Sequence, residues 1–296
     1  MSTDRAQSGL DHDRRSFRYY RHAVERHWDP HEIDLEPDRE AIADVPEPAF
    51  DGLRETLALF GAGEEAVTED LSPLGVVLEN AADQLFVTTQ LYEEAKHADF
   101  FDRYWRTVIA PEEQRRDLEP SAPTDDRWFN APYDELFERN ETAMHRLLVE
   151  DTPENRALAY CHYHMAIEGI LAQTGYYGVQ RNFSGDFEEL PRLPALVEGF
   201  SSIRSDEGRH VGFGMWKLKT LVRDEGVAPR LVTDTVGELA MLTQRIVGGA
   251  TEEGASGVGE DELIGYAAEK HAQRMEQIVD ASAEMPSVEE LVSLDR

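Results

Sequence analysis

The sequence predicts an all-α protein with a four-helix bundle core and additional helices, and three observations support this fold class. First, proline interrupts helix interiors, and the prolines here cluster between long proline-free stretches. Second, apolar residues within these stretches recur every three or four positions, as from Val87 through Leu91 to Ala95. Third, no alternating apolar and polar run is bounded by hairpin turns, so strands are not expected. The long stretches are 74–110, 154–190, 195–228 and 230–285.

Shorter helices and connections complete the predicted organisation. Thr152 and Pro153 predict a helix start, because threonine caps free N–H groups and proline fits the first helical position. A helix with Pro73 inside it or at a kink is expected over residues 53–78. Other predicted helices cover about 16–28, 133–149, 230–249 and 260–281, with a polar connection over 112–131 and a flexible loop over 250–259. Together they predict one helical domain over 16–283, between a flexible N-terminus, 1–15, and a loosely held C-terminal tail, 284–296.

Composition limits the classes of protein and partner. With 296 residues, of which 41% are hydrophobic, the chain can bury a full core. Acidic residues number 60 against 29 lysines and arginines, and the formal net charge of −31 repels nucleic acids and anionic membranes. This acidic excess also predicts a halophilic protein, because the high salt in the cytosol of a halophile screens the repulsion between the carboxylates. Because the chain shows no membrane-spanning apolar run and no apolar signal core, we expect a cytoplasmic protein.

Two matching motifs carry the strongest chemical signal. Glu94 precedes His97 by three positions in one predicted long helix, and Glu207 precedes His210 by three positions in another. Residues three apart share a helix face, so both members of a pair can bind one metal ion. One such match is expected by chance in a chain so rich in glutamate, but both histidines here lie deep in apolar helical stretches. The two motifs therefore predict a metal site between helices.

Two further carboxylates are needed to complete a dinuclear site. Glu168 lies on a third long helix among apolar residues, where an unpaired carboxylate would be costly to bury and a metal ion would remove that cost. A fourth helix, upstream of Glu94, offers several glutamates. Glu64 is preferred because it shares a helix face with Val67, whereas Glu65 shares its face with polar residues and is kept as the reserve candidate. The remaining candidates are Glu69 and Glu79.

This ligand set indicates which metals are suited to the site. One glutamate from each of two helices, plus a Glu-x-x-His pair from each of two others, is the arrangement of di-iron and di-manganese carboxylate bundles. Four carboxylates neutralise two divalent ions, and oxygen and nitrogen ligands with open positions suit manganese and iron. The single cysteine, Cys161, excludes an intrachain disulfide and a thiolate cluster. Asp206 is a candidate to accept the outer N–H of a metal-bound histidine.

The same stretches resemble the ribonucleotide reductase small-subunit superfamily of the ferritin-like fold, and within it the R2-like ligand-binding oxidases. The likeness runs from about Tyr19 to Tyr266. It is carried by H-W-D-P at 27–30, E-I-D at 32–34, G-E-E-A-V-T at 63–68, E-E-A-K-H at 93–97 and D-E-G-R-H at 206–210. The Glu-x-x-His pairs mark the superfamily, while the G-E-E-A-V-T stretch is more specific.

The resemblance implies a chemistry and a set of site residues. It implies a mixed manganese–iron cofactor rather than two irons, reaction with O2, and a long-chain fatty-acid-like ligand with its head group on the metals. It also implies an oxidative ether crosslink between Val67 and Tyr163. Tyr163 lies five residues before Glu168, about 140° around an ideal helix, so it needs a local bulge or an oblique reach. The implied metal ligands are Glu64, Glu94, His97, Glu168, Glu207 and His210.

Three functional hypotheses follow. The leading one is a dinuclear oxidase that uses O2 for a two-electron oxidation, as a homodimer by resemblance, with an electron donor that no motif identifies. The alternative is the radical-generating small subunit of ribonucleotide reductase, which needs an aromatic relay and a docking tail, yet residues 285–296 contain no aromatic residue. A non-catalytic metal-storage protein is the third, and a content near two ions per chain would argue against it.

Overall fold

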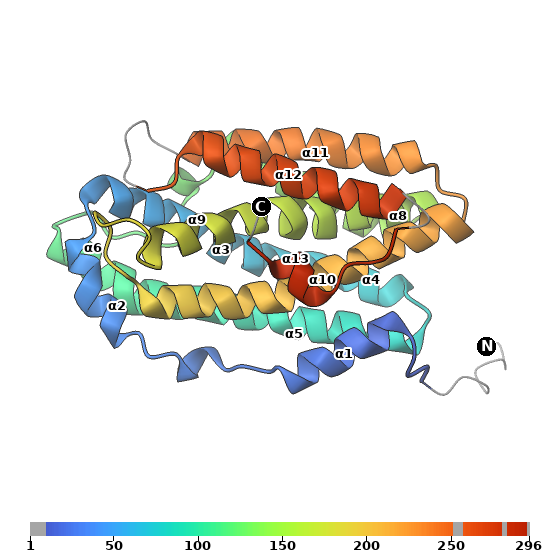
Figure 1. Cartoon of the computed structure of the whole chain (residues 1–296), viewed down its shortest axis with the longest axis horizontal. Coiled ribbons are helices and arrows are strands. Elements are labelled where there is room, and N and C mark those ends of the chain that lie inside the picture. The colour runs from blue at the N-terminus through green and yellow to red at the C-terminus, as the bar shows by residue number, and fades with distance from the viewer. Residues whose placement is uncertain (1–9, 251–256, 280–282, 295–296) are drawn as a thin grey trace.

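The computed structural model describes residues 10–250, 257–279 and 283–294, and within these ranges the chain is helical and has no β-strand. Figure 1 shows the long helices packed lengthwise against one another, as in a bundle. The α-helices are α1 (Arg15–Glu25), α2 (Glu36–Ala41), α3 (Glu47–Asp70), α4 (Ser72–Val77), α5 (Ala81–Tyr104), α6 (Ala110–Arg115), α7 (Ala131–Leu147), α8 (Pro153–Tyr160), α9 (Gln173–Phe183), α10 (Pro194–Asp224), α11 (Pro229–Ala250), α12 (Glu260–Val279) and α13 (Val288–Val292). Between them lie the π-helical segments η3 (Trp105–Ile109) and η5 (Cys161–Ala172), and the 3₁₀ segments η1 (Pro30–Glu32), η2 (Ile42–Asp44) and η4 (Asp126–Trp128).

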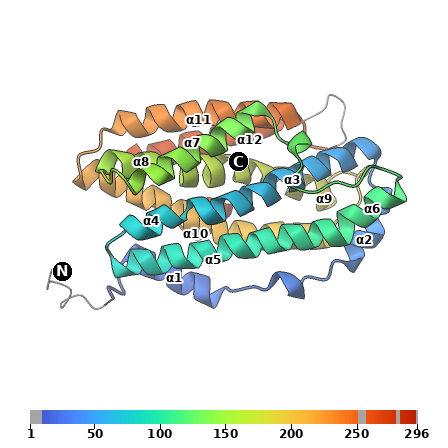
Figure 2. The ribbon, with the colours of Figure 1, turned by 180° about the vertical axis from the view of Figure 1, so that it is seen from behind.

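The bundle core consists of α3, α5, α10 and the continuous run of α8, η5 and α9. Helix α3 packs along α5, and α10 packs against both η5 and α5. Figure 2 shows α3 and α5 side by side from behind. The other helices cover this core: α1 lies on α5 and α10, α11 and α12 lie on η5, and α7 lies between α3 and α11. None of the described helices combines the length and the apolar character that a membrane span requires.

The apolar core consists of two clusters separated along the bundle by a polar layer. On α5, Phe86 belongs to one cluster and Phe100 to the other, and on α10 Val211 and Ile203 are divided in the same way. All four side chains are buried. The intervening turns of both helices carry buried polar and charged side chains instead. Such a layer is costly to bury unless its members are paired or bind a cation, so it marks the place to look for a site.

The region predicted as one helix over 53–78 forms two helices. Helix α3 starts earlier, at Glu47, with Pro48 in its first turn, where a missing N–H costs nothing. It ends at Asp70, and Leu71 links it to α4, which carries Pro73 in its own first turn. The break therefore falls where proline would otherwise remove a hydrogen bond from a helix interior.

In two other regions the structure has more helix than was predicted. One helical region continues past Pro111, and the other lies within the predicted C-terminal tail. The chain after α5 passes through η3 into α6, which contains Pro111. The wider π-helical turn of η3 accommodates the proline, which lacks an N–H and crowds the preceding turn.

In the predicted tail, Ser287 and Glu290 form a capping box that starts α13, and α13 packs against α10. Residues 1–9 of the predicted flexible N-terminus and 251–256 of the predicted loop lie outside the described residues.

Candidate metal centre

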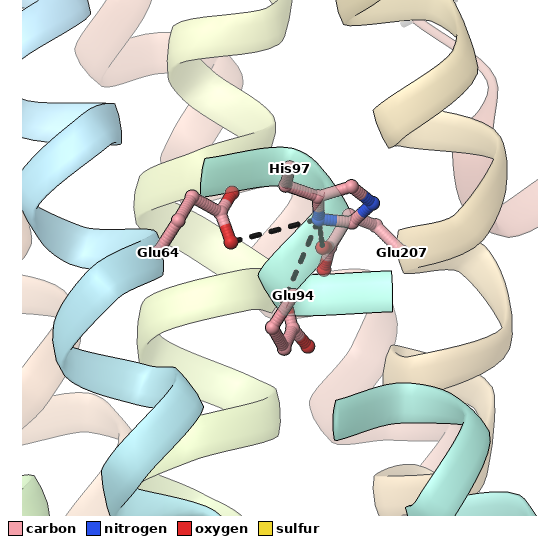
Figure 3. A group of neighbouring side chains, drawn as sticks. All are labelled: Glu64, Glu94, His97 and Glu207. Carbon is pink, nitrogen blue, oxygen red and sulfur yellow. Dashed lines mark ion pairs between the residues drawn. The ribbon is translucent and has the colours of Figure 1, made fainter. Parts of the chain in front are cut away.

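Each bundle helix contributes to one buried cluster of carboxylates and imidazoles in the polar layer. The two Glu-x-x-His pairs lie on α5 and α10, while the remaining two glutamates come from α3 and η5. The cluster forms two overlapping groups, each with ligand atoms within 4.8 Å of one another. Figure 3 shows one of these groups converging from three helices. The first group is Glu64, Glu94, His97 and Glu207, and the second is Glu94, Glu168, Glu207 and His210.

The inner nitrogens of the two histidines define the two halves of the cluster. His97 Nδ1 lies 3.5 Å from Glu64 Oε2 and 3.3 Å from Glu94 Oε2. His210 Nδ1 lies 3.1 Å from Glu94 Oε1 and 3.3 Å from Glu168 Oε1. Glu94 thus presents one oxygen to each half, and Glu207 Oε1 lies 3.5 Å from both nitrogens. Glu94 and Glu207 thus belong to both halves of the cluster, whereas Glu64 and Glu168 each belong to one half.

The other glutamates considered for the first position lie away from the cluster. Glu65, Glu69 and Glu79 are all exposed, whereas Glu64 is buried on the inner face of α3. Helical spacing explains this difference, because Glu64 shares its face with Val67 and points toward α5, while Glu65 is rotated by about 100° toward solvent.

The outer nitrogens of the histidines are held by a second layer of charged groups. His97 Nε2 lies 3.2 Å from Asp206 Oδ2, the partner that the sequence suggested, and His210 Nε2 lies 2.8 Å from Glu93 Oε2. A carboxylate on the outer nitrogen fixes the tautomer, which leaves the inner nitrogen free to bind a cation. The fully buried guanidinium of Arg209 donates to both Glu93 and Asp206, and so connects the two histidine–carboxylate pairs.

Further groups hold Asp206 and the inner carboxylates in place. Trp28 Nε1 donates to Asp206 Oδ2 at 2.8 Å, and Lys96 Nζ lies 2.8 Å from the same oxygen. Burial raises the pKa of Asp206, but the imidazole of His97 and the cationic groups of Arg209 and Lys96 outweigh it and lower that pKa. On the opposite side, Gln90 Nε2 donates to Glu168 Oε1 at 2.8 Å. Sequence reasoning did not single out Gln90, Glu93, Lys96 or Arg209.

Within the described part of the chain, several buried atoms of the cluster residues lack hydrogen-bond partners. These atoms are Nδ1 of both histidines, Oε2 of Glu168 and Oε2 of Glu207. Buried polar atoms in proteins are almost always hydrogen-bonded, so a group of orphaned acceptors at one point needs a cation to satisfy them. Carboxylate oxygens and neutral imidazole nitrogens are ligands for manganese and iron. The residues present therefore fit a dinuclear metal centre.

Protons compete with metal cations for these groups. Burial raises the pKa of Glu64 to about 8, and burial together with the carboxylate of Glu207 raises the pKa of Glu168 well above its ordinary value. Burial also acts on Glu94, but the imidazoles of His210 and His97 outweigh it and lower the pKa of Glu94. Burial disfavours the cationic form of both histidines, yet the facing glutamates outweigh it and raise their pKa. Metal binding must therefore displace protons.

This competition leads to a pH-dependent effect of metal removal on stability. The folded-state pKa of Glu64, about 8, lies above its ordinary value of 4.5, so its contribution to stability is complete below 4.5 and is lost as pH rises through 8. The pKa of Glu168 is also raised, so its contribution to stability is likewise lost as pH rises. We expect the melting temperature of metal-free protein to fall between about pH 5.5 and 8, while that of metal-loaded protein changes less.

Differential scanning calorimetry on chelator-treated and metal-reconstituted protein measures this gap in melting temperature. The difference in melting temperature between the metal-loaded and metal-free protein should widen as pH rises. The melting temperature of the metal-free Glu64→Gln variant should fall less than that of the metal-free wild type. A gap that narrows toward pH 8 would contradict the assignment of these carboxylates to a cation site.

Comparison with known proteins places this site in a family. A model of the family "Ribonucleotide reductase, small chain" matches residues 12–284. The chain belongs to the ribonucleotide reductase small-chain family. This match covers all four helices of the metal centre.

Solved structures in the same family give a finer likeness. An R2-like ligand-binding oxidase, a tyrosine-to-phenylalanine variant with an aerobically reconstituted Mn/Fe cofactor, is 28% identical, with a TM-score of 0.80 over 90% of this chain and 94% of that chain. A glycine-to-leucine variant with an anaerobically reconstituted Mn/Fe cofactor is 27% identical, with a TM-score of 0.83 over 95% of this chain and 100% of that chain. A further glycine-to-leucine variant, with a non-activated Mn/Mn cofactor, is 28% identical, with a TM-score of 0.82 over 93% of this chain and 98% of that chain. The fold is that of the R2-like oxidases, two of whose structures named here carry Mn/Fe cofactors, and this chain has the buried carboxylate and histidine cluster for such a dinuclear centre.

A π-helical segment brings Tyr163 to the metal centre of this small-chain protein. Tyr163 and Glu168 both lie in η5, where hydrogen bonds join residues five apart, so residues at this spacing come closer to the same face. The Tyr163 hydroxyl is buried and donates to Glu94 Oε1 at 2.7 Å. Glycine is needed within this segment, because a Cβ at Gly169 would lie 2.7 Å from the carbonyl oxygen of His164. Of the two possibilities that the spacing of Tyr163 left open, a local bulge or an oblique reach, the backbone has the bulge.

A cavity of about 380 Å³ extends from the metal centre between α3 and α9. Its inner end includes Glu64, Val67 and Tyr163, and its wall reaches Pro48 at the start of α3. The sixteen helical steps from Glu64 to Pro48 correspond to about 24 Å of helix. Most of the intervening wall is apolar, with Leu59, Phe60, Ile167, Leu171, Val179 and Phe183. The cavity is therefore an elongated, mainly apolar space that opens onto the carboxylate and histidine cluster.

Proposed function

We propose that this chain is a dinuclear Mn/Fe oxidase that uses O2 for two-electron oxidation and binds a long-chain, fatty-acid-like carboxylate at its metals. The observation that carries the proposal is the joining of an apolar channel to two overlapping Glu/His groups within one buried site. Relatives described as ligand-binding oxidases with Mn/Fe cofactors support it.

The six proposed ligands follow from the two groups. Glu64 and His97 would hold one ion, Glu168 and His210 would hold the other, and Glu94 and Glu207 belong to both groups. When bound, the Mn/Fe pair supplies the redox chemistry with O2. The chain's own residues orient and shield it: Asp206 and Glu93 hold the histidine rings, Gln90 holds Glu168, and the two apolar clusters exclude water.

We also propose that Val67 and Tyr163 become joined by an ether bond. Both side chains are buried and both line the inner end of the cavity beside Glu64 and Glu94. Joining the phenolic oxygen of Tyr163 to a side-chain carbon of Val67 removes one hydrogen from each residue. The two electrons and two protons released are taken up by O2, which is the oxidant of the reaction.

Elemental analysis combined with peptide mass spectrometry tests this function. Protein reconstituted with Mn(II) and Fe(II) and then exposed to air is expected to contain two ions per chain. It should also yield a joined peptide pair, containing Val67 and Tyr163, whose mass is two hydrogens below the sum of the separate peptides. Tyr163→Phe should bind the same two ions but give only separate peptides, as should wild-type protein kept without air. Separate, unmodified peptides from aerated wild type would contradict the crosslink.

A radical-generating small subunit of ribonucleotide reductase is the second candidate, and the family match favours it. That role requires a C-terminal segment able to dock on a large subunit, whereas α13 packs on the chain's own α10. Nucleotide reduction after addition of a large subunit would support this candidate over the oxidase. Metal content separates both from a storage role, because storage requires many more than two ions per chain.

A further inference from the structure

Arg274 on α12 is a buried cation to which no carboxylate of the described residues is hydrogen-bonded. Its side chain is 4% exposed, and its Nη1 atom has no hydrogen-bond partner. Other buried arginines behave differently: Arg54 donates to Asp51 and Glu113, and Arg209 donates to Glu93 and Asp206. An uncompensated buried charge is costly, and this one is retained in a chain with a large excess of acidic residues. A function is therefore expected for its charge.

The guanidinium of Arg274 lies beside Gly169, the residue that follows the proposed ligand Glu168. A Cβ placed on Gly169 would lie 3.1 Å from Arg274 Nη1, so the cation packs against the backbone next to Glu168. Tyr266 and Glu168 are the groups that act on it electrostatically. Burial lowers the pKa of Arg274 to about 10, which still leaves it positively charged at neutral pH. Arg274 thus supplies a fixed positive charge at the Glu168 side of the site.

The fixed charges around the site leave the positive charge of Arg274 unbalanced. Four inner glutamates carry four negative charges, which two divalent ions neutralise. Among the outer groups, Glu93 and Asp206 carry two negative charges, which Arg209 and Lys96 neutralise through direct contacts. The site without a ligand therefore retains one positive charge, that of Arg274. A singly charged anion at the inner end of the cavity would balance it.

We infer that Arg274 is a specificity-determining residue, whose fixed charge makes the metal-loaded cavity select a monoanionic head group over a neutral head group on the same alkyl chain. This inference rests on the proposed function, since it concerns the ligand of that site. Among the described residues, Arg274 does not line the cavity, so we expect its charge to act through the protein interior and not by contact. Removing this unit charge is expected to change the preference for the anionic over the neutral head group about tenfold.

Competition between decanoic acid and decan-1-ol tests the inference. Metal-loaded protein is equilibrated with equal amounts of the two, and the bound molecules are extracted and quantified by mass spectrometry, after the metal content has been measured. Wild type is expected to retain decanoate in excess. Arg274→Met and Arg274→Gln should lower the decanoate-to-decanol ratio about tenfold, while Arg274→Lys should keep it. Two neutral variants are used so that a poorly folded one can be replaced by the other.

Arg204 provides the matched control. It lies on α10, is partly exposed, and experiences the hydroxyls of Tyr266 and Tyr176 but not Glu168. Arg204→Met should therefore leave the ratio unchanged. An unchanged ratio in both neutral Arg274 variants, with two ions per chain, would overturn the role of Arg274 alone. Wild type with fewer than two ions per chain would overturn the proposed function, and the charge count with it.

Discussion

Glu94→Gln is expected to reduce bound metal from two ions per chain to less than one. Glu94 presents Oε2 to the His97 half of the site and Oε1 to the His210 half, so its replacement removes a ligand from both ions. The amide keeps the shape of the side chain but lacks the negative charge. A loss of affinity on the order of 100-fold or more is expected, beyond the 10–100-fold typical of groups that only support a ligand.

Glu64 and Glu168 give a graded comparison with Glu94. Each belongs to one half of the site, so Glu64→Gln and Glu168→Gln should each retain about one ion. Glu65→Gln is the matched control, because Glu65 is exposed beside Glu64 on α3. Elemental analysis after reconstitution and dialysis measures the content of each variant. Equal metal loss in all three inner variants, or normal content in Glu94→Gln, would contradict the bridging position of Glu94.

Arg209→Met is expected to lower the free energy of unfolding by about 3–5 kcal/mol. Arg209 is fully buried and donates to both Glu93 and Asp206, so its loss leaves two buried carboxylates with one cationic partner fewer. Lys96 still pairs with Asp206, whereas Glu93 retains only the imidazole of His210. The destabilisation should therefore be accompanied by weaker metal binding.

Urea unfolding of metal-free protein measures this effect without a contribution from bound ions. Arg223→Met serves as control, because Arg223 is an exposed arginine paired only with its neighbour Asp224, and no measurable change is expected. Arg209→Lys should recover part of the stability but not the double contact, since an ammonium lacks the planar fork of arginine. A loss below about 1 kcal/mol in Arg209→Met would contradict the linking role of the guanidinium.

The part of the site that could be predicted from sequence is the part that helix geometry determines locally. Pairs three apart must share a face, and this placed His97 beside Glu94 and His210 beside Glu207 before any coordinates were known. The same spacing separated buried Glu64 from exposed Glu65. The all-helical fold could be predicted from proline spacing for a related reason. Proline disrupts a helix within one turn, and the shared face of residues three apart is also determined within one turn.

The remaining features depend on contacts between distant helices or on unusual backbone, which local spacing does not encode. Glu93 was visible only as the neighbour of Glu94, and its pairing with His210 joins residues 117 positions apart. The π-helical form of η5 has no local sequence signature, and the five-residue spacing between Tyr163 and Glu168 left open either a local bulge or an oblique reach. Arg274 resembled any other helical arginine until its packing against Gly169 was known.

Anomalous X-ray diffraction from crystals of protein reconstituted with Mn(II) and Fe(II) tests the central claim most directly. Data collected on either side of the manganese and iron absorption edges should show two peaks roughly 3.5–4 Å apart, one Mn and one Fe. One peak should lie beside His97 Nδ1 and the other beside His210 Nδ1, with Glu94 between them. A single peak, or peaks only at surface carboxylates with both imidazoles unliganded, would contradict the assignment of this site as a dinuclear centre.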